Sequence, residues 1–318
     1  MTEEKLAGLI ETFGAEQVVV RDEPQREMRL QTLQELRGRF ENPGEFLLIQ
    51  GEEVTDSWDG HPVHINAVNI ENVVPPAHGE SVADTIQRNM EAIVAEGERS
   101  GREVFAHLNH PNFGWGVTVA EVAAMPLERF FEVYNGHSGV RNYGDAGHPS
   151  MEALWDSALT TRLEENGLGL LYGVATDDSH EYYSWGVGKT NPGRGWVMVL
   201  ADSLEPNEIV RAMKAGDFYA STGVVLAELH VTKESMRIRI EPAKGAIHTT
   251  QFIGTLRGHG PQDVGVVLAE VQGDEATYTF SGKEVYVRAQ VVSSEDHPNP
   301  YAAGDKKTAW VQPVIPGQ

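Results

Sequence analysis

The chain has 318 residues, 40% of them hydrophobic and 23% charged, as in a soluble globular protein of one large or two ordinary domains. Its 25 basic and 47 acidic residues give a net charge of −22, which disfavours binding to nucleic acids and to anionic membranes. There is no cysteine, so disulfides, thiolate nucleophiles and cysteine-based zinc sites are excluded. Any metal must therefore be held by His, Asp or Glu.

The start of the chain shows no targeting or membrane signal. Residues 1–14 are acidic and helix-like, and they lack the basic start and apolar run of a secretory signal. No segment has about 18 consecutive apolar residues, so no membrane span is expected. We expect a soluble protein and favour the cytoplasm, although the sequence leaves the location open.

Residues 1–225 alternate between short apolar runs and amphipathic helical patterns. Helices are expected at 81–101, 150–167 and 205–217, where apolar residues recur at helical spacing and the pattern ends at or next to a glycine. The runs expected to form strands are 45–54, 64–70, 104–110, 129–135, 168–177 and 195–201. This alternation predicts a mostly parallel sheet with helices, either open or closed into a barrel.

The pattern changes after about residue 225. The helical periodicity stops, and alternating apolar and polar residues are interrupted by Gly, Pro and Asp turns. We therefore predict an α/β domain at 1–225, followed by an antiparallel β-sandwich-like domain at 226–318.

Polar side chains gather where several of the predicted strands end, which is where α/β sheets place their chemistry. A single histidine at such a place is more often structural than functional, but the recurrence at successive strands favours one shared site. The residues concerned are Glu53, His61, His64, His107, His110, Glu132, Asn135, His137, Asp177, Asp178 and His180.

The stretch GVATDDSHEY (173–182) has the most suggestive spacing in this set. Asp178 and His180 are two residues apart, so on an extended segment both side chains face one ion. Of His61 and His64, three apart, only one need point inward. Carboxylates and imidazoles without cysteine are the ligands of hydrolytic centres with divalent ions, which lower the pKa of bound water.

The ordered motifs from about residue 45 onward resemble the PHP superfamily, named for its polymerase and histidinol phosphatase members. The resemblance is to its stand-alone metallohydrolases with a C-terminal β domain. It implies a distorted (β/α)7 barrel, two or three divalent ions (zinc, manganese or iron) in a complete site, and phosphoester hydrolysis. The motifs are GEEVT, HINAVN, HLNHPNFGWG, FEVYNG, GVATDDSHEY, PGRGWVMV and GDFYASTG, followed by EVYVRAQV and AWVQPV.

The resemblance also implies roles for individual residues. Glu53 resembles a metal-bridging carboxylate, and Asp178 with His180 resembles a metal anchor that also handles a proton. His107 and Asp177 are near-neighbour candidates that orient the ligands or carry protons, and His107 is counted among the catalytic candidates. Arg194 is a candidate contact for a substrate anion, with a structural role as an equal alternative. The expected metal ligands are Glu53, His64, His110, Asp178 and His180.

One part of the family pattern is missing. The chain contains no His-x-His, and its first 40 residues are largely helical and polar. The resemblance therefore predicts a barrel without its first βα units and a metal site with fewer ligands. Because such a barrel exposes strand edges, we also expect that a homo-oligomer can form.

Three functions fit these observations. The leading one is a metal-dependent hydrolase that uses metal-activated water on a small, anionic phosphoester. The second is a PHP-like protein that has lost catalysis and acts by binding. The third is a metal-dependent hydrolase of carboxyl esters or amides, because a metal-bound hydroxide also attacks carbonyl carbon.

Overall fold

The computed structural model describes residues 1–127 and 129–317, and the chain divides into two compact units, Met1–Leu48 and Ile49–Gln318. The first unit holds helix α1 (Glu3–Phe13), the paired short strands β1 (Val20–Arg21) and β2 (Glu27–Met28), and helix α2 (Leu33–Phe40). Helix α2 begins in a capping box between Thr32 and Glu35, which explains why it starts there.

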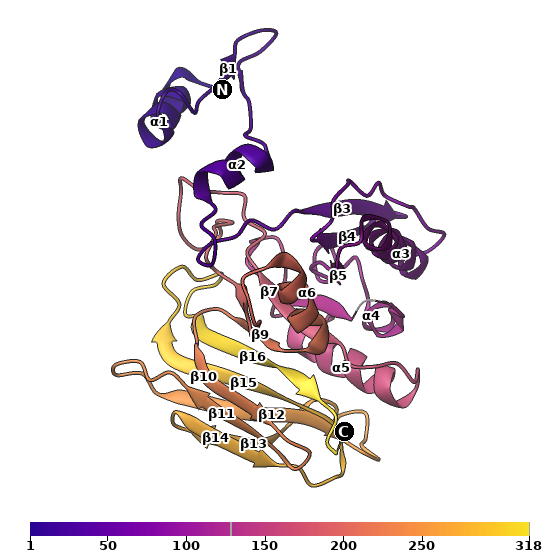
Figure 1. Ribbon diagram of the computed structural model, residues 1–318. Helices are drawn as coiled ribbons and strands as arrows, with labels where there is room; N and C mark the ends of the chain where they lie inside the picture. The colour runs from indigo at the N-terminus through magenta and orange to yellow at the C-terminus, as the bar shows by residue number, and fades with distance from the viewer. Residues whose placement is uncertain (128, 318) are drawn as a thin grey trace. The chain divides into compact units, whose positions relative to one another are not determined.

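The second unit begins with a five-stranded sheet of order β3-β4-β5-β6-β7 (Figure 1). Pairing is antiparallel from β3 to β5 and parallel from β5 to β7. The strands are β3 (Gly51–Trp58), β4 (His61–Val68), β5 (Phe105–Leu108), β6 (Phe130–Asn135) and β7 (Tyr172–Thr176), and the helices between them are α3 (Val82–Ser100), α4 (Val119–Ala124) and α5 (Met151–Glu164). The sheet and its helices form a mixed α/β fold, but the sheet is not mostly parallel as predicted, because two of its four strand pairs are antiparallel.

The predicted barrel is not seen among residues 1–127 and 129–317, because β3 and β7 are the two ends of this sheet. Two features explain the difference. Strands β3 and β4 form a hairpin through Asp59 and Gly60, with φ of 46° and 80°, where a barrel would need a crossover helix. The next predicted strand, β8 (Trp196–Val199), joins another sheet.

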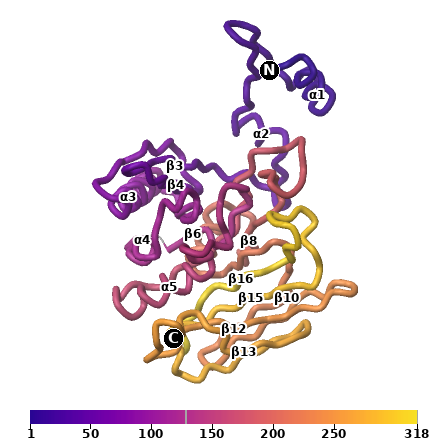
Figure 2. The backbone as a smooth tube through the Cα atoms, turned by 180° about the vertical axis from the view of Figure 1, so that it is seen from behind, coloured from indigo at the N-terminus to yellow at the C-terminus, as the bar shows by residue number. Residues whose placement is uncertain are grey.

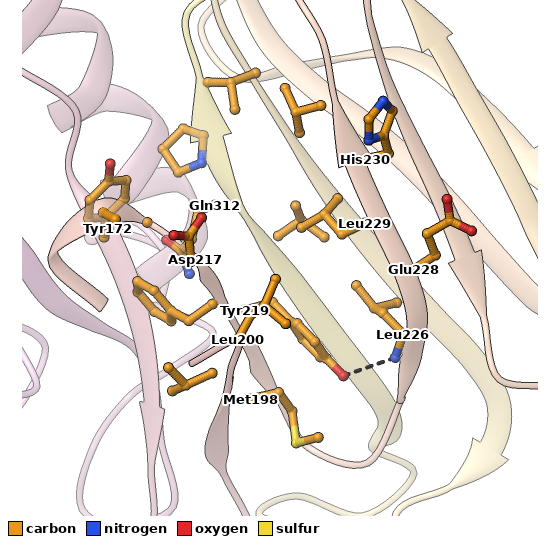
Figure 3. Close-up of a pocket in the computed structure, with 18 of the residues that line it drawn as sticks. Tyr172, Met198, Leu200, Asp217, Tyr219, Leu226, Glu228, Leu229, His230 and Gln312 are labelled. Carbon is orange, nitrogen blue, oxygen red and sulfur yellow. Dashed lines mark hydrogen bonds between the residues drawn. The ribbon is translucent and has the colours of Figure 1, made fainter. Parts of the chain in front are cut away.

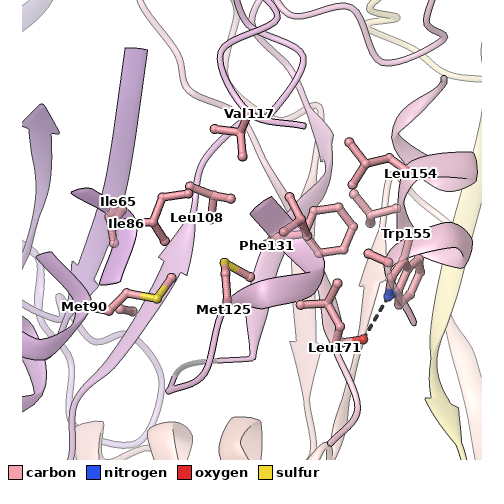
Figure 4. Close-up of a cluster of buried hydrophobic side chains, with 14 of the residues drawn as sticks. Ile65, Ile86, Met90, Leu108, Val117, Met125, Phe131, Leu154, Trp155 and Leu171 are labelled. Carbon is pink, nitrogen blue, oxygen red and sulfur yellow. Dashed lines mark hydrogen bonds between the residues drawn. The ribbon is translucent and has the colours of Figure 1, made fainter. Parts of the chain in front are cut away.

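Alternation along β4 explains why a polar site can lie against a packed core. Val63, Ile65 and Ala67 are fully buried on the side of helix α3, whereas His64 points to the opposite face of the strand. Helix α3 covers this side with Ile86, Met90 and Ile93, and Figure 4 shows Ile65 beside Ile86 and Leu108. The Nε1 of Trp155 donates to the carbonyl of Leu171 at 2.8 Å, so the one polar atom of that indole is satisfied (Figure 4).

The rest of the chain forms two further sheets, of order β13-β12-β15-β16-β9-β8 and β10-β11-β14; Figure 2 follows the first from β8 to β13. One buried apolar cluster joins them, with side chains from β11 packed against β12, β15 and β16. The new elements are α6 (Pro206–Ala215), β9 (Phe218–Ser221), β10 (Leu226–Val231), β11 (Ser235–Ile240), β12 (His248–Leu256), β13 (Val266–Gln272), β14 (Glu275–Thr279), β15 (Glu284–Asp296) and β16 (Lys306–Val314).

The larger of these sheets crosses the domain boundary expected near residue 225. Strands β8 and β9 precede that point, yet β9 pairs with β16 through Ala220 and Trp310. Residues 49–318 form one compact unit, and the division into 1–225 and 226–318, like the β-sandwich description, stays a prediction. Within the residues that the structure describes, no helix is long and apolar enough to cross a membrane.

A buried ion pair links the α/β part to the C-terminal sheets. Arg288 on β15 donates to both carboxylate oxygens of Asp156 on α5, at 2.7 and 2.6 Å. The hydroxyl of Tyr286 donates to the same carboxylate at 2.8 Å. The Asp156 carboxylate outweighs the effect of burial and raises the pKa of Arg288. This pair is therefore charged, bidentate and held within the protein interior.

Candidate metal centre

Glu53, His64 and His110 bring three possible metal ligands together, with all ligand atoms within 4.8 Å of one another. The Oε1 of Glu53 lies 3.2 Å from His64 Nδ1 and 3.7 Å from His110 Nε2. Strand pairing explains the first contact: Glu53 lies opposite Asn66 and His64 opposite Thr55, so Glu53 and His64 are diagonal neighbours across the β3–β4 pair. His110 arrives from the loop that follows β5.

Asp178 lies at the margin of this group, after the end of β7. Its Oδ2 is 3.9 Å from His110 Nε2, and its φ of 44° is unusual for a residue other than glycine. Such strained positions persist where the surrounding structure fixes them, and they concentrate at functional sites. The geometry thus allows Asp178 to share an ion with His110.

His180 lies farther out. Its Nδ1 is 2.8 Å from the carbonyl of Asp178 and 3.6 Å from Asp178 Oδ1, and its side chain is 64% exposed. The ring of His137 meets it edge to face, with 5.1 Å between ring centroids. The structure places His180 next to Asp178, as the spacing predicts, but on the solvent side of the Glu53, His64 and His110 group.

The buried carboxylate of Glu132 on β6 supports the ligands from below. It accepts hydrogen bonds from the backbone N–H of His110 at 2.8 Å, from Asn135 Nδ2 at 2.7 Å and from Thr176 Oγ1 at 2.8 Å. Asn135 Nδ2 also donates to Asp178 Oδ2 at 3.2 Å. Glu132 and Asn135 therefore connect His110 and Asp178, which lie on separate loops.

Asn109 holds Glu53 in place in the same way that Glu132 and Asn135 hold His110 and Asp178. Its Nδ2 donates to Glu53 Oε1 at 2.8 Å, and its Oδ1 accepts from the backbone N–H of Asn66 at 3.3 Å. From the sequence, Glu132 and Asn135 were expected among the polar residues at strand ends, without an assigned role, and Asn109 was not identified. The signal for Asn109 in the sequence was its position next to His110 in the motif HLNH.

Phe113 is a further residue that the sequence reasoning did not identify. Its ring centroid lies 5.0 Å from that of His110, 6.2 Å from His64 and 6.0 Å from His137. An aromatic ring in contact with three imidazoles restricts their rotation and removes water from one side of the site. It belongs to the HPNFGWG loop after His110.

The charges of the centre influence one another strongly. The imidazoles of His110 and His64 beside it hold the pKa of Glu53 well below its usual range. Burial lowers the pKa of His110, but the nearby carboxylates of Glu53, Glu132 and Asp178 outweigh burial, and the net effect is a raised pKa. Burial raises the pKa of Glu132. The carboxylates of the site therefore stabilise positive charge between them, and a bound cation could supply that charge.

The structure places His107 beneath the centre, not at its opening. The ring is buried, burial lowers its pKa to about 4, and its Nδ1 has no hydrogen-bond partner among the described residues. Nδ1 is 4.0 Å from Glu132 Oε1. The ring therefore lies buried below the ligands, and the role in proton transfer predicted for His107 stays a prediction.

The guanidinium of Arg194 is occupied by structural hydrogen bonds. The guanidinium is fully buried and donates to the carbonyls of Gly136 (2.8 Å), Gly186 (2.9 Å) and Asn299 (3.2 Å), and also to Lys189. These bonds occupy the group that was expected to meet a substrate anion. Arg194 instead ties together three loops around the site.

Asp177 has a structural task of its own. Its carboxylate accepts the backbone N–H groups of Gly193 (2.7 Å), Arg194 (2.7 Å) and Gly195 (2.9 Å), which fixes the chain just before Asp178. His61 lies exposed on the face of β4 opposite His64, as their odd spacing requires. Neither side chain belongs to the group of possible metal ligands.

Comparison with known proteins adds little to this geometry. No family model matches the sequence, and no curated protein matches it. Among solved structures, the chain is similar to a two-domain protein from Bacteroides vulgatus that contains a predicted PHP-like metal-dependent phosphoesterase, at 15% sequence identity and a TM-score of 0.35. The alignment covers 84% of this chain and 75% of that chain. A likeness of this size carries no argument, so any function must rest on the site itself.

Proposed function

We propose that the protein is a metal-dependent hydrolase of small anionic esters, with phosphoesters as the preferred class. The observation that carries the proposal is the convergence of Glu53, His64 and His110 within 4.8 Å. Two imidazole nitrogens and a carboxylate oxygen, with Asp178 beside them, suit zinc, manganese or iron.

The electrostatics of the site fit such an ion. The carboxylates of Glu53 and Asp178 lie beside His110 and raise its pKa, so they stabilise positive charge at this place. A divalent ion supplies that charge at neutral pH and converts a net negative site into one that attracts an anionic substrate. When bound, it would supply a water molecule of lowered pKa and a Lewis acid for the ester oxygen.

The protein's own residues orient the reacting groups. Asn109 holds Glu53, and Glu132 with Asn135 holds His110 and Asp178, so the ligand atoms are fixed before any substrate arrives. His180 is exposed and lies next to Asp178, which is where a group that exchanges a proton with a leaving oxygen must be. His137 and Phe113 form the wall beside it.

The decisive experiment compares His64→Asn with His61→Asn. Both histidines lie on β4, but only His64 faces the site. After loading with manganese or zinc, metal content and hydrolysis of p-nitrophenyl phosphate, bis(p-nitrophenyl) phosphate and p-nitrophenyl acetate are measured. The proposal expects stoichiometric metal and phosphoester hydrolysis in the unchanged protein and in His61→Asn, and loss of both in His64→Asn.

The other outcomes identify the alternatives. Metal binding with hydrolysis of the acetate alone would favour a carboxyl esterase. Metal binding that depends on His64, without any hydrolysis, would favour a non-catalytic binding protein. Substoichiometric metal in all three proteins would overturn the metal centre.

A further inference from the structure

A groove of about 830 Å³ lies between the two C-terminal sheets, away from the metal centre. Figure 3 shows Met198, Leu200 and Tyr219 on one side of it and Leu226 and Leu229 on the other. The hydroxyl of Tyr219 accepts the backbone N–H of Leu226 at 2.9 Å, so one hydrogen bond spans the two sheets at this place (Figure 3). The walls are mostly apolar, as in sites that bind ligands.

The groove exists because the three-stranded sheet covers only part of the six-stranded sheet. Strands β10, β11 and β14 face the larger sheet, and the buried cluster that joins the sheets takes most of its residues on that larger sheet from β12, β15 and β16. Strand β8 forms the less covered end, whereas β9 is buried throughout and its Tyr219 belongs to the buried cluster. Leu200, just after β8, is consequently 80% exposed, and Val231 at the end of β10 is 40% exposed. A side chain as apolar as Leu200 normally gains from being covered.

One edge of β10 lies next to the groove, and its first N–H, that of Leu226, is already bound by the Tyr219 hydroxyl. Strand β10 pairs with β11 and, in the described part of the chain, with no other strand. Its six residues extend for about 20 Å, at roughly 3.3 Å per residue. The outer edge of such a strand presents N–H and C=O groups that can pair with another extended chain. Proteins commonly protect such edges with Lys, Pro, other charged side chains or bulges. Strand β10 contains neither Lys nor Pro, but it carries Glu228 and an irregular register between Leu226 and Glu228, so Leu229–Val231 is the regular part of this edge.

The charge of the groove selects among possible occupants. Its lining contains the carboxylates of Asp217 and Glu228 and no Lys or Arg among the described residues. Glu228 is already paired with Arg239, at 3.2 Å. Asp217 is exposed, has no ion pair within the described residues, and lies near Tyr172 at the other side of the groove (Figure 3). A basic side chain is the complement of this carboxylate.

A second copy of the chain does not suit this place. Pairing of β10 with its symmetry mate would continue one three-stranded sheet into the other. The groove lining, which carries Asp217 and Glu228 and no Lys or Arg among the described residues, would then meet an identical acidic lining. A single extended strand fills the uncovered position without this conflict.

We infer that the groove binds an extended segment of another polypeptide, which adds to the free edge of β10. Apolar side chains at alternate positions of the segment cover Met198, Leu200 and Tyr219, and a Lys or Arg meets Asp217. Main-chain pairing contributes the affinity and the alternate side chains the selectivity, as in other cases of strand addition. This inference does not depend on the metal centre.

The test starts from a random heptapeptide library displayed on phage, selected on the immobilised full-length protein and counter-selected on the Leu200→Ser/Asp217→Lys variant. Both side chains are exposed, so the variant keeps the fold. We expect enrichment of sequences that alternate apolar and polar residues and contain at least one basic residue. The enriched peptide should bind the double variant at least about tenfold more weakly, which corresponds to about 1.4 kcal/mol. Val73→Ser, with an apolar side chain 78% exposed elsewhere, is the matched control and should not change the affinity.

Backbone methylation then tests strand addition directly. Successive N–H groups of an extended peptide point to opposite edges. Methylation of every second amide on one edge should abolish binding, and methylation on the other edge should leave it. Equal effects of both methylated peptides, no enrichment over the double variant, or groove binding by dodecylamine but by no peptide would each overturn the inference.

Discussion

The ion pair of Asp156 and Arg288 and the centre around Glu53 are both clusters of ionisable side chains, but only the first is saturated by the protein itself. Arg288 donates two hydrogen bonds to Asp156, and Tyr286 a third. At the centre, Glu53 approaches His64 and His110 at only 3.2 and 3.7 Å, and the bidentate pairing seen at Asp156 is missing from these contacts.

The difference shows how to tell structural charge from functional charge. Where donors and acceptors match, a buried pair needs no further ligand and contributes to how the sheets are joined. Where carboxylates surround imidazoles at longer distances, as around Glu53, the group could hold a cation. The predictions below test this distinction, in order of decreasing expected effect.

Loss of one member of the saturated pair should cost the most. Arg288→Met leaves the Asp156 carboxylate buried with the Tyr286 hydroxyl as its main donor, and we expect the free energy of unfolding to fall by about 3–5 kcal/mol. Urea denaturation followed by circular dichroism measures it. The double variant Asp156→Leu/Arg288→Met should lose less, because no uncompensated charge remains; an equal or larger loss would show that the charges themselves are not what matters.

Acid should destabilise the centre through His107. Burial lowers its pKa from 6.5 to about 4, so the folded protein holds the neutral ring while the unfolded chain takes up a proton. The free energy of unfolding is therefore not reduced by His107 above pH 6.5. It falls as the pH falls toward 4, by a total on the order of 3 kcal/mol. The raised pKa of Glu132 acts in the opposite direction, so the informative quantity is the difference from His107→Leu.

That variant should show the smaller decline between pH 6.5 and 4, measured by urea denaturation at several pH values. His61→Asn, on the exposed part of β4, should keep the decline of the unchanged protein. Parallel curves for His107→Leu and the unchanged protein would contradict the assignment.

Removal of a proposed ligand should reduce metal affinity without unfolding the protein. For Glu53→Gln we expect the affinity for manganese or zinc, measured by titration calorimetry, to fall by at least about 100-fold, more than is typical for a supporting residue. The free energy of unfolding of the metal-free protein should change by no more than about 1 kcal/mol. Glu91→Gln, on the exposed side of α3, serves as the control, and a Glu53→Gln protein with normal affinity would exclude this carboxylate as a ligand.

The connecting amide should have the smallest effect. Asn135→Ala breaks the link between Glu132 and Asp178, and we expect a loss of roughly 10–100-fold in metal affinity. Asn166→Ala, whose side chain donates to Ala123 instead, is the matched control for loss of an amide. Equal affinities of the two variants would mean that Asp178 is held without Asn135.

Several elements could be predicted because their signals are local. The helices expected at 81–101, 150–167 and 205–217 are α3, α5 and α6, since caps and apolar periodicity depend only on neighbours in the sequence. The same holds for Asp178 and His180, which follow strand β7, whereas Glu53 lies near the start of β3 and His64 within β4, and not at strand ends as predicted. Whether these are ligands stays a prediction.

The sequence by itself determined the ligand chemistry, because a chain without cysteine offers a metal only His, Asp and Glu, and it determined which segments carry them. Only the tertiary structure decided that β3 and β4 form a hairpin, that Arg194 and His107 are buried, and that Glu132 joins His110 to Asp178. The physical reason is that strand order and the environment of a charged side chain arise from contacts between residues far apart in the sequence, which periodicity and local motifs do not encode.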